Sequence, residues 1–261
     1  MRAPAHPHPV SRAAFFDLDG TLLPPPSLER RFARFLRWRG HLGTRNLFRW
    51  LGKAVRLAPR GLLALRHANK MYLCGLAATE SDAPRLPLAV NFFPAALECV
   101  QWHAAQGHRI VILSGTLEFL VECAARALET QLAARGCTVA VSVCATRLEV
   151  SEQRWTGHIL GEPMAGEAKA RAAVRLAERG GFALADCYAY ADGASDSSFL
   201  EVVGQAVAVN PSWGLARIAR ANGWPILQWR KQRESARPTL SAGGRCACRE
   251  ELRITRQESR T

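Results

Sequence analysis

The sequence predicts an α/β fold: a parallel β-sheet with helices on both faces, plus a small helical cap inserted after the first strand. Two observations predict the sheet. The 261 residues are enough for one ample domain and a smaller inserted one, and short apolar segments typical of strands alternate with segments of helical periodicity. A third observation predicts the cap, because three consecutive prolines, Pro24-Pro25-Pro26, interrupt that alternation.

The first strand ends in two acids. The apolar residues 13–16 lead into Asp17, Leu18, Asp19 and Gly20, so two carboxylates are expected at the carboxyl edge of the sheet, where open α/β proteins bind ligands. Alternate residues share a face, so both acids can address one point, and two such charges need a cation or a shared proton. The pattern indicates a hard metal such as Mg²⁺, acid–base chemistry, or both. A simple turn is the alternative; a calcium loop would need glutamate where Leu28 stands.

The segment after this strand reads as the cap, over residues 24–90. Phe32, Phe35 and Leu36 have helical spacing, and so do Leu47 and Leu51 further on. The chain is expected to re-enter the core at residues 87–94. The predicted core therefore comprises residues 13–23 and 91–229, between a disordered N-terminus (1–12) and a flexible basic tail (230–261).

The remaining core elements alternate in type. Helices are expected over residues 95–105, 117–128, 168–179, 197–203 and 213–221. Strands are expected over residues 109–113, 187–191 and 206–209, with another around 139–143. Residues 146–159 read as a β-hairpin.

Three polar groups lie at the ends of these later elements. Ser114-Gly115-Thr116 ends the second strand, where a hydroxyl and backbone N–H groups suit a phosphate oxygen, although Ser114 could simply cap the next helix. Lys169 lies in the first turn of a helix, where a positive charge is unfavourable for the helix dipole, and this indicates another role for the lysine. A solvated surface lysine is the alternative reading. Asp192-Gly193-Ala194-Ser195-Asp196 is a second acidic group after a strand, and a helix cap is its alternative reading.

Together these four segments resemble the signature of the haloacid dehalogenase superfamily of phosphotransferases, over residues 13–229. Asp17-Leu18-Asp19-Gly20-Thr21-Leu22 resembles its first motif, Ser114-Gly115-Thr116 its second, Lys169 its third, and the segment 192–196 its fourth. The spacing is similar to that of the phosphoserine phosphatase branch. The resemblance implies a Rossmann-like parallel sheet with a helical cap between the first and second motifs.

The resemblance also implies a role for each residue. Asp17 would be the nucleophile that forms an aspartyl-phosphate, and Asp19 the general acid and then the base. Phosphate binding would fall to Ser114, Gly115, Thr116 and Lys169, with Ser114 and Lys169 counted among the catalytic groups.

The implied cofactor is Mg²⁺. It would be held by the carboxylates of Asp17 and Asp192 and the backbone carbonyl of Asp19, with Asp196 a further ligand or an anchor behind the ligands. The charge of a phosphate monoester gives this set a physical reason, because a divalent cation and a lysine offset the repulsion between the ester and the carboxylates.

The implied function is Mg²⁺-dependent hydrolysis of a small phosphorylated metabolite or a lipid head group. In phosphoserine phosphatases a cap-entry glutamate usually holds the substrate amine, but Pro24-Pro25-Pro26 occupies that place here and Glu29 falls later. The first motif also reads Asp-Gly-Thr where Asp-Ser-Thr is common, so phosphoserine is not the expected substrate. Two alternatives stay open: a non-catalytic relative whose cap binds an anionic partner, and phosphoryl transfer to an acceptor other than water.

The positive charge is concentrated in the cap and the tail. The chain has a formal net charge of +13; residues 27–85 carry 13 basic and 3 acidic side chains, and residues 230–261 carry 9 and 4. The basic cap could steer an anionic substrate, rest on an anionic membrane surface, contact nucleic acid, or be a solvated face. No nucleic-acid-binding motif supports the third reading.

Cysteine usage and hydropathy indicate in which cellular compartment the protein is expected. Several of the eight cysteines lie in expected helices or strands, where cysteine behaves as a small apolar residue, and Cys246 and Cys248 in the tail have no second pair to complete a zinc site. No run of 18 apolar residues is present, and no apolar signal core precedes the first strand. We expect a reduced, cytoplasmic protein, with peripheral membrane contact if the cap binds lipid. The sequence gives no indication of oligomeric state.

Overall fold

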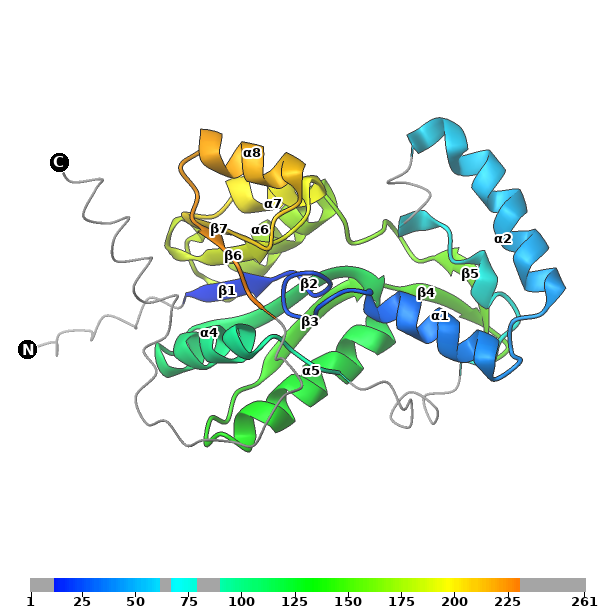
Figure 1. The fold of residues 1–261 in the computed structure, drawn as a ribbon, viewed down its shortest axis with the longest axis horizontal. Coiled ribbons are helices and arrows are strands. Elements are labelled where there is room, and N and C mark those ends of the chain that lie inside the picture. Colours follow the sequence, from blue (N-terminus) through cyan, green and yellow to red (C-terminus); the bar gives the residue numbers. More distant parts are fainter. Residues whose placement is uncertain (1–11, 62–66, 79–89, 231–261) are drawn as a thin grey trace, which may run out of the picture.

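The computed structural model describes residues 12–61, 67–78 and 90–230 (Figure 1). Its centre is a six-stranded sheet in the order β3-β2-β1-β6-β7-β8, in which every neighbouring pair is parallel. The strands are β1 (Ala13–Phe16), β2 (Arg109–Leu117), β3 (Val141–Thr146), β6 (Tyr188–Ala191), β7 (Gln205–Val209) and β8 (Ile226–Leu227). The predicted parallel α/β architecture is confirmed.

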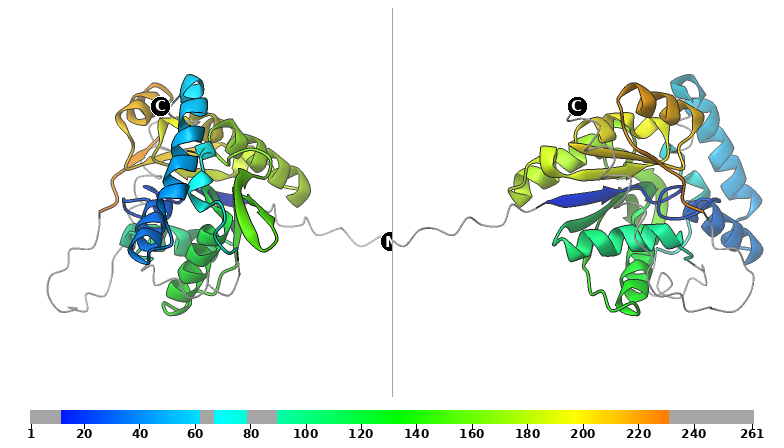
Figure 2. Two further views of the ribbon diagram at one scale, coloured as in Figure 1. Left: turned by 90° about the vertical axis from the view of Figure 1, so that its right-hand side faces the viewer. Right: turned by 60° about the vertical axis from the view of Figure 1, so that its left-hand side comes forward.

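Helices cover both faces of the sheet. Helices α4 (Pro94–Ala105) and α5 (Glu118–Ala133) lie on one face, and α6 (Glu167–Gly180), α7 (Ser197–Glu201) and α8 (Trp213–Ala221) on the other (Figures 1 and 2). Strand β1 is buried on both sides, because Ala14 and Phe16 join one apolar cluster while Ala13 and Phe15 join the other. A four-residue strand without a polar side chain is therefore what its central position requires.

The cap follows β1 directly. It contains α1 (Leu28–Trp38), α2 (Thr44–Leu57) and two short 3₁₀ helices, η1 (Ala58–Arg60) and η2 (Met71–Leu73). Helix α1 begins where the Ser27 hydroxyl accepts a hydrogen bond from the Arg30 amide. The ends of the chain (1–11 and 231–261) lie outside the described residues, as do residues 62–66 and 79–89, which hold part of the predicted re-entry into the core.

The predicted hairpin forms as β4 (Leu148–Ser151) and β5 (Arg154–Ile159) and lies beside the cap. The Gly75 amide donates to the Trp155 carbonyl at 2.8 Å, and the Trp155 amide donates to the Leu76 carbonyl at 2.9 Å. The Trp155 ring also stacks on Phe119 of α5, with ring centroids 4.9 Å apart. The hairpin thus joins the cap to the core at a point far in sequence from either end of the cap.

Several element boundaries differ from those expected. Strand β2 runs to Leu117 instead of ending at residue 113, because β3 ends at Thr146, beyond the expected end at residue 143, and keeps pairing with β2 across a register shift between Ser114 and Leu117. Helix α5 extends to Ala133, five residues beyond the predicted end, and α7 stops at Glu201. Strand β8 was not expected, because two residues are too short to show a period.

An aromatic group lies behind the carboxyl end of β1. The Phe16 and Tyr190 rings stack with centroids 4.7 Å apart, and the Tyr190 hydroxyl is 2.8 Å from Nε2 of fully buried His103. Nδ1 of His103 lies 2.8 Å from Nδ1 of His108. Burial, followed by the neighbouring His108, lowers the pKa of His103 well below its ordinary value, so the imidazole is neutral.

Two further expectations concern the chain as a whole. No helix in the described ranges is both long and apolar enough to cross a bilayer. The six cysteines within these ranges are present as thiols and not as disulfides, and Cys246 and Cys248 lie outside these ranges.

Candidate active site

The two acids of the first motif are fixed by a turn at the end of β1. The Asp17 amide donates to the Tyr190 carbonyl at 2.9 Å and so extends the pairing with β6 by one residue. The chain then folds back, with the Leu22 and Leu23 amides both donating to the Leu18 carbonyl. The Thr21 hydroxyl lies 3.4 Å from Asp17 Oδ2. The motif is therefore a rigid turn at the carboxyl edge of the sheet, as the sequence predicts.

Lys169 brings the first, third and fourth motifs together. It lies in the first turn of α6, and its side chain is only 3% exposed. Its Nζ donates to Asp17 Oδ1 at 2.5 Å and to Asp196 Oδ2 at 2.7 Å. Burial lowers the pKa of Lys169, but the two carboxylates outweigh this and raise it above its ordinary value. The lysine is a fixed positive charge beside Asp17.

The negative charge around Asp17 is greater than one lysine can offset. Burial raises the pKa of Asp17 from 3.8 to about 7, Lys169 opposes this, and the nearby carboxylates of Asp196 and Asp192 raise it further. Three carboxylates thus meet one ammonium group in a buried space. Such a set is stabilised by an added divalent cation, and its oxygen donors are those that Mg²⁺ prefers.

Asp192 reaches the first motif from β6. A Cβ atom placed on Gly20 would lie 2.1 Å from Asp192 Oδ2, so the carboxylate rests directly against the Gly20 backbone, which has a φ of +96°. Glycine is required here for both reasons. Within the described residues no three His, Cys, Asp or Glu side chains cluster as a metal site on their own. A donor set of two carboxylates and the Asp19 carbonyl does not need such a cluster, and the residues present fit Mg²⁺.

Asp19 is held by the cap and by the second motif. Its Oδ1 accepts a hydrogen bond from the Leu28 amide at 2.7 Å, and its Oδ2 accepts one from the Thr116 hydroxyl at 2.6 Å. Leu28 is the first residue of α1, so the Asp19 carboxylate occupies the N-terminus of a cap helix, where a negative charge is favoured. Both oxygens of Asp19 are therefore engaged as hydrogen-bond acceptors.

The second motif lies at the end of β2. Ser114 is buried, and its Oγ accepts a hydrogen bond from the Thr116 amide at 3.2 Å. The Gly115 carbonyl accepts a hydrogen bond from the Thr146 hydroxyl at 2.9 Å, which fixes the peptide. The Thr116 hydroxyl, expected at the phosphate, is directed at Asp19 in this structure; a phosphate contact by Thr116 stays a prediction.

The sequence analysis did not identify one residue at this motif. His67 of the cap lies so close to Gly115 that a Cβ atom on the glycine would be 2.7 Å from His67 Nδ1. A histidine of the cap therefore lies over the loop expected to hold phosphate, and any residue other than glycine at position 115 would displace it. No local pattern marks His67, because the contact joins residues 48 positions apart.

A second buried ion pair lies in the cap. Lys70 is 1% exposed, and its Nζ contacts both carboxylate oxygens of Glu29, at 2.7 and 2.5 Å. The Tyr72 hydroxyl donates to Glu29 Oε1 at 2.9 Å. Burial, with Lys70 as a second cause, lowers the pKa of Lys53. Glu29 is therefore occupied by residues of the cap itself.

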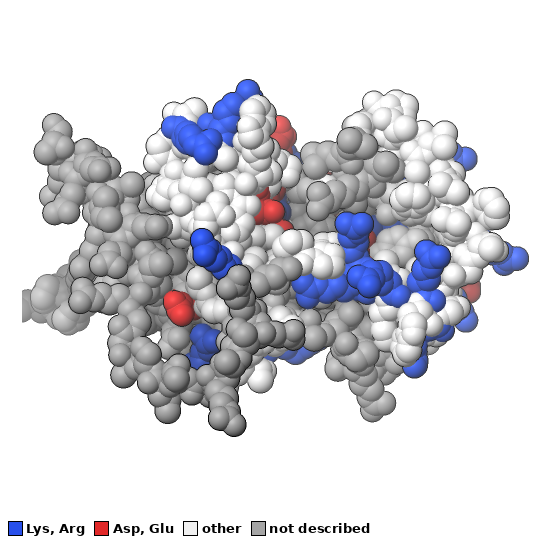
Figure 3. Space-filling view, in the orientation of Figure 1, with Lys and Arg blue, Asp and Glu red and all other residues white. Residues whose placement is uncertain are grey.

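Charge separates the two sides of the molecule around this site. Figure 3 shows acidic atoms on the side of the core that faces the cap and basic atoms over α1. In the described part of the cap, Glu29 is the sole acidic residue, against eleven lysines and arginines.

The class of protein follows from comparison with known families. The sequence profile of the haloacid dehalogenase-like hydrolases matches residues 14–201. The chain belongs to this family, in the phosphoserine phosphatase-like branch, and it is an enzyme of the phosphatase type. The predicted family and enzyme class are confirmed.

Particular relatives support this placement. The chain is 31% identical over 242 residues to phosphoserine phosphatase SerB1 of Mycobacterium tuberculosis, covering 88% of this chain and 75% of that protein. It is 28% identical over 233 residues to a histidinol-phosphatase of Neisseria meningitidis, covering 85% and 100%. A solved structure of a Bordetella pertussis protein of unknown function is 30% identical, with a TM-score of 0.66, and the match covers 84% of this chain and 99% of that one.

Proposed function

We propose that this enzyme is a Mg²⁺-dependent phosphomonoesterase that works through an aspartyl-phosphate on Asp17. One observation carries the proposal: buried Lys169 bridges Asp17 and Asp196, residues from three separate motifs, at 2.5 and 2.7 Å. A purely structural role would not need a buried lysine to hold two carboxylates at the edge of a sheet where ligands bind. A perturbed carboxylate with a specific charged partner is typical of a catalytic site.

The chemistry follows from the positions of the side chains. Asp17 Oδ2 is the oxygen free of Lys169, and it attacks phosphorus while the bond to the ester oxygen breaks. Asp19, once protonated, gives its proton to the departing oxygen. The same carboxylate then takes a proton from the water that attacks the aspartyl-phosphate, which releases phosphate and restores Asp17. The positive charge of Lys169 offsets the negative charge of the site in both steps.

The residues that would hold Mg²⁺ are Asp17, Asp192 and the Asp19 carbonyl, with Asp196 assigned chiefly to Lys169. When bound, the ion supplies positive charge against the carboxylates and the phosphoryl oxygens. The phosphate would be held by Ser114, the Gly115 amide and Lys169, under His67 of the cap.

The proposed substrate is a small phosphorylated metabolite or a lipid head group. Both oxygens of Glu29 contact Lys70, so this glutamate does not offer a free carboxylate to the amine of phosphoserine. The basic cap favours an anionic partner, and we place the protein in the cytoplasm with contact to an anionic membrane surface. The relatives named for phosphoserine and histidinol phosphate define the first esters to test.

The experiment is a phosphatase assay on the purified chain with an aryl phosphate. Activity is expected with Mg²⁺ and is expected to be lost in a chelator and in Asp17→Asn. Asp186→Asn is the matched control, since Asp186 is a half-exposed acid far from the motifs whose partner is Arg12 at 3.9 Å. Full activity of Asp17→Asn, or full activity in chelator, would refute the mechanism.

A panel of esters with two readouts then separates the alternatives. The panel comprises phosphoserine, histidinol phosphate and lysophosphatidate. Release of inorganic phosphate indicates hydrolysis, whereas a phosphorylated acceptor without free phosphate indicates transfer. No turnover of any ester, with Mg²⁺ bound, would favour the non-catalytic alternative.

A further inference from the structure

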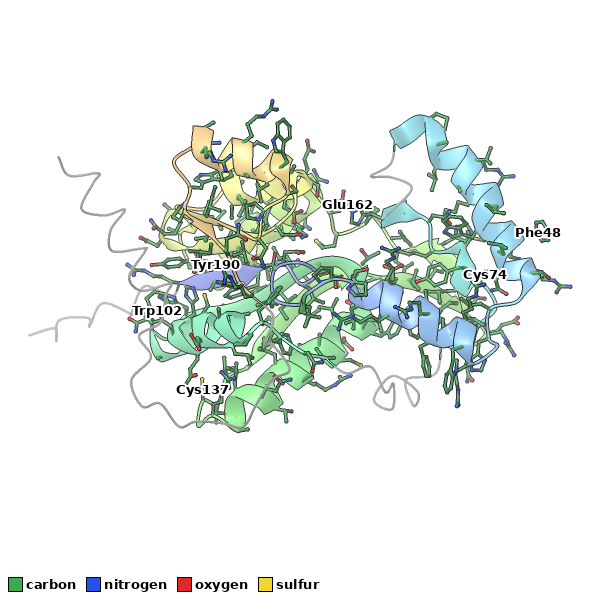
Figure 4. All side chains as sticks on the ribbon, viewed as in Figure 1. Phe48, Cys74, Trp102, Cys137, Glu162 and Tyr190 are labelled. Atoms are coloured by element: carbon green, nitrogen blue, oxygen red, sulfur yellow. The ribbon has the colours of Figure 1, made fainter. Side chains whose placement is uncertain are left out.

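The outer face of α2 exposes large apolar side chains to water. Leu47, Phe48, Leu51 and Val55 form this face, and Phe48 and Val55 are 71% and 73% exposed. Phe48 projects outward from the helix, away from the rest of the chain (Figure 4). Trp38, at the end of α1 just before α2, is 79% exposed. Of eight exposed large apolar side chains in the described residues, these are five.

The outer face takes no part in holding the cap together. The other three residues of this face, Phe48, Leu51 and Val55, follow Leu47 by one, four and eight positions, so all four lie on one side of the helix. The opposite side is attached to the rest of the cap: Asn46 Nδ2 donates to the carbonyls of Tyr72 and Cys74, and Asn69 Nδ2 donates to the Trp50 carbonyl. None of the four apolar residues belongs to the hydrophobic clusters of the described part of the chain. Folding of the cap therefore does not explain these side chains.

Arginines border this face. Arg45, Arg49 and Arg56 lie together on the adjacent side of α2, which contains no acidic residue. None of the three forms an ion pair with a carboxylate among the described residues. Glu29 cannot offset them because Lys70 occupies it. The helix thus combines an apolar stripe with uncompensated positive charge.

We propose that the outer face of α2 binds an anionic lipid bilayer, with α2 lying in the plane of the interface. The apolar side chains would enter the boundary between head groups and acyl chains, and the arginines would lie at the level of the lipid phosphates. A second copy of the chain is disfavoured as the occupant, because a symmetric contact would bring two sets of arginines together. This inference goes beyond the phosphatase activity and does not depend on it.

The test is co-sedimentation of the full chain with vesicles. Vesicles of phosphatidylcholine alone are compared with vesicles containing roughly one third phosphatidylglycerol, at about 50 mM and about 500 mM salt. We expect binding to the anionic vesicles at low salt, and binding at least about tenfold weaker at high salt or without the anionic lipid.

Variants locate the surface. Phe48→Glu with Val55→Glu is expected to weaken vesicle binding at least about tenfold, because two charges would have to enter the apolar boundary. Trp213→Glu is the matched control: Trp213 is 78% exposed on α8 of the core, so the same kind of change is made away from the cap. Phe48→Gln with Leu51→Gln is a second, uncharged pair. Arg45→Glu with Arg56→Glu is expected to remove the salt-sensitive part of binding.

The outcomes are distinguishable from those of the phosphatase assay. All these variants are expected to keep wild-type activity on a soluble aryl phosphate, which also shows that they fold. No binding of the wild-type chain to anionic vesicles at low salt overturns the proposal, and so does wild-type binding by both apolar variants. A dimer in light scattering that the Phe48 variants convert to a monomer, without vesicle binding, assigns the face to self-association instead.

Discussion

Replacing Asp17, the proposed nucleophile, by asparagine is expected to stabilise the metal-free enzyme while it abolishes catalysis. The pKa of Asp17 is 3.8 in an unfolded chain and about 7 in the folded, cation-free site, chiefly because of burial. Below pH 4 the carboxyl is protonated in both states and contributes nothing to their difference. As the pH rises from about 4 to about 7, the unfolded state loses its proton while the folded state keeps it, so folding becomes progressively less favourable.

The magnitude follows from that interval. About three pH units at roughly 1.36 kcal/mol each give a destabilisation of about 4 kcal/mol above pH 7. Asparagine imitates the neutral carboxyl, so Asp17→Asn should raise the free energy of unfolding by up to about 4 kcal/mol at pH 8. The gain should vanish near pH 4. Asp186→Asn, the half-exposed control, should change stability by less than about 0.5 kcal/mol at either pH.

The assay is urea unfolding of both variants and the wild type in a chelator, at pH 8 and near pH 4. Saturating Mg²⁺ should then narrow the gap at pH 8, since binding to the folded wild type adds stability by mass action. Equal stability of Asp17→Asn and wild type at pH 8 without metal would refute the argument that burial and the neighbouring carboxylates disfavour the charged form of Asp17.

Three further changes probe the neighbouring contacts. Gly20→Ala should raise the Mg²⁺ concentration needed for half-maximal activity, because the new Cβ would lie 2.1 Å from Asp192 Oδ2. The backbone φ of +96° would add about 1–3 kcal/mol of strain for alanine. An unchanged Mg²⁺ dependence of the activity would contradict the assignment of Asp192 to the metal. Thr116→Val should lower kcat about 10- to 100-fold, because it removes the hydroxyl that lies 2.6 Å from Asp19 Oδ2. Thr116→Ser keeps a hydroxyl, so its kcat should stay near that of the wild type. An equal loss of kcat in both variants would indicate that packing of the threonine side chain is what matters. The free energy of unfolding should fall by up to about 1.4 kcal/mol per pH unit below about pH 6.5, since buried neutral His103 takes up a proton only on unfolding. Urea unfolding of Asp17→Asn removes the opposing contribution of Asp17 and measures His103 together with His108, whose pKa is also lowered by burial. A stability that does not change with pH in this range would exclude the effect.

The sequence was sufficient to predict the architecture because the core follows local rules. Apolar strands such as residues 13–16 and 188–191 are short runs without charge, and the helices between them have clear periodicity. Polar residues that follow such strands have to gather at one edge of a parallel sheet. The meeting of Asp17, Lys169 and Asp196 is a consequence of that topology.

What the sequence could not predict depends on contacts between distant residues. Lys70 counts as one more basic residue of a basic cap until the fold places it against Glu29, 41 positions away, and buries it. Thr116 lies within the register shift between Ser114 and Leu117 at the end of β2, and its hydroxyl donates to Asp19, 97 positions away. Such details are set by the return of the cap onto the core, and no periodicity records them.

The hydrogen bond from the Leu28 amide ties the orientation of Asp19, the proposed acid and base, to the first turn of the cap. A foreign cap grafted between Pro24 and the core would have to begin a helix at this same spot to keep the acid oriented. Substitutions around α2, at the distal end of the cap, should therefore disturb Asp19 less than substitutions at the first turn of α1.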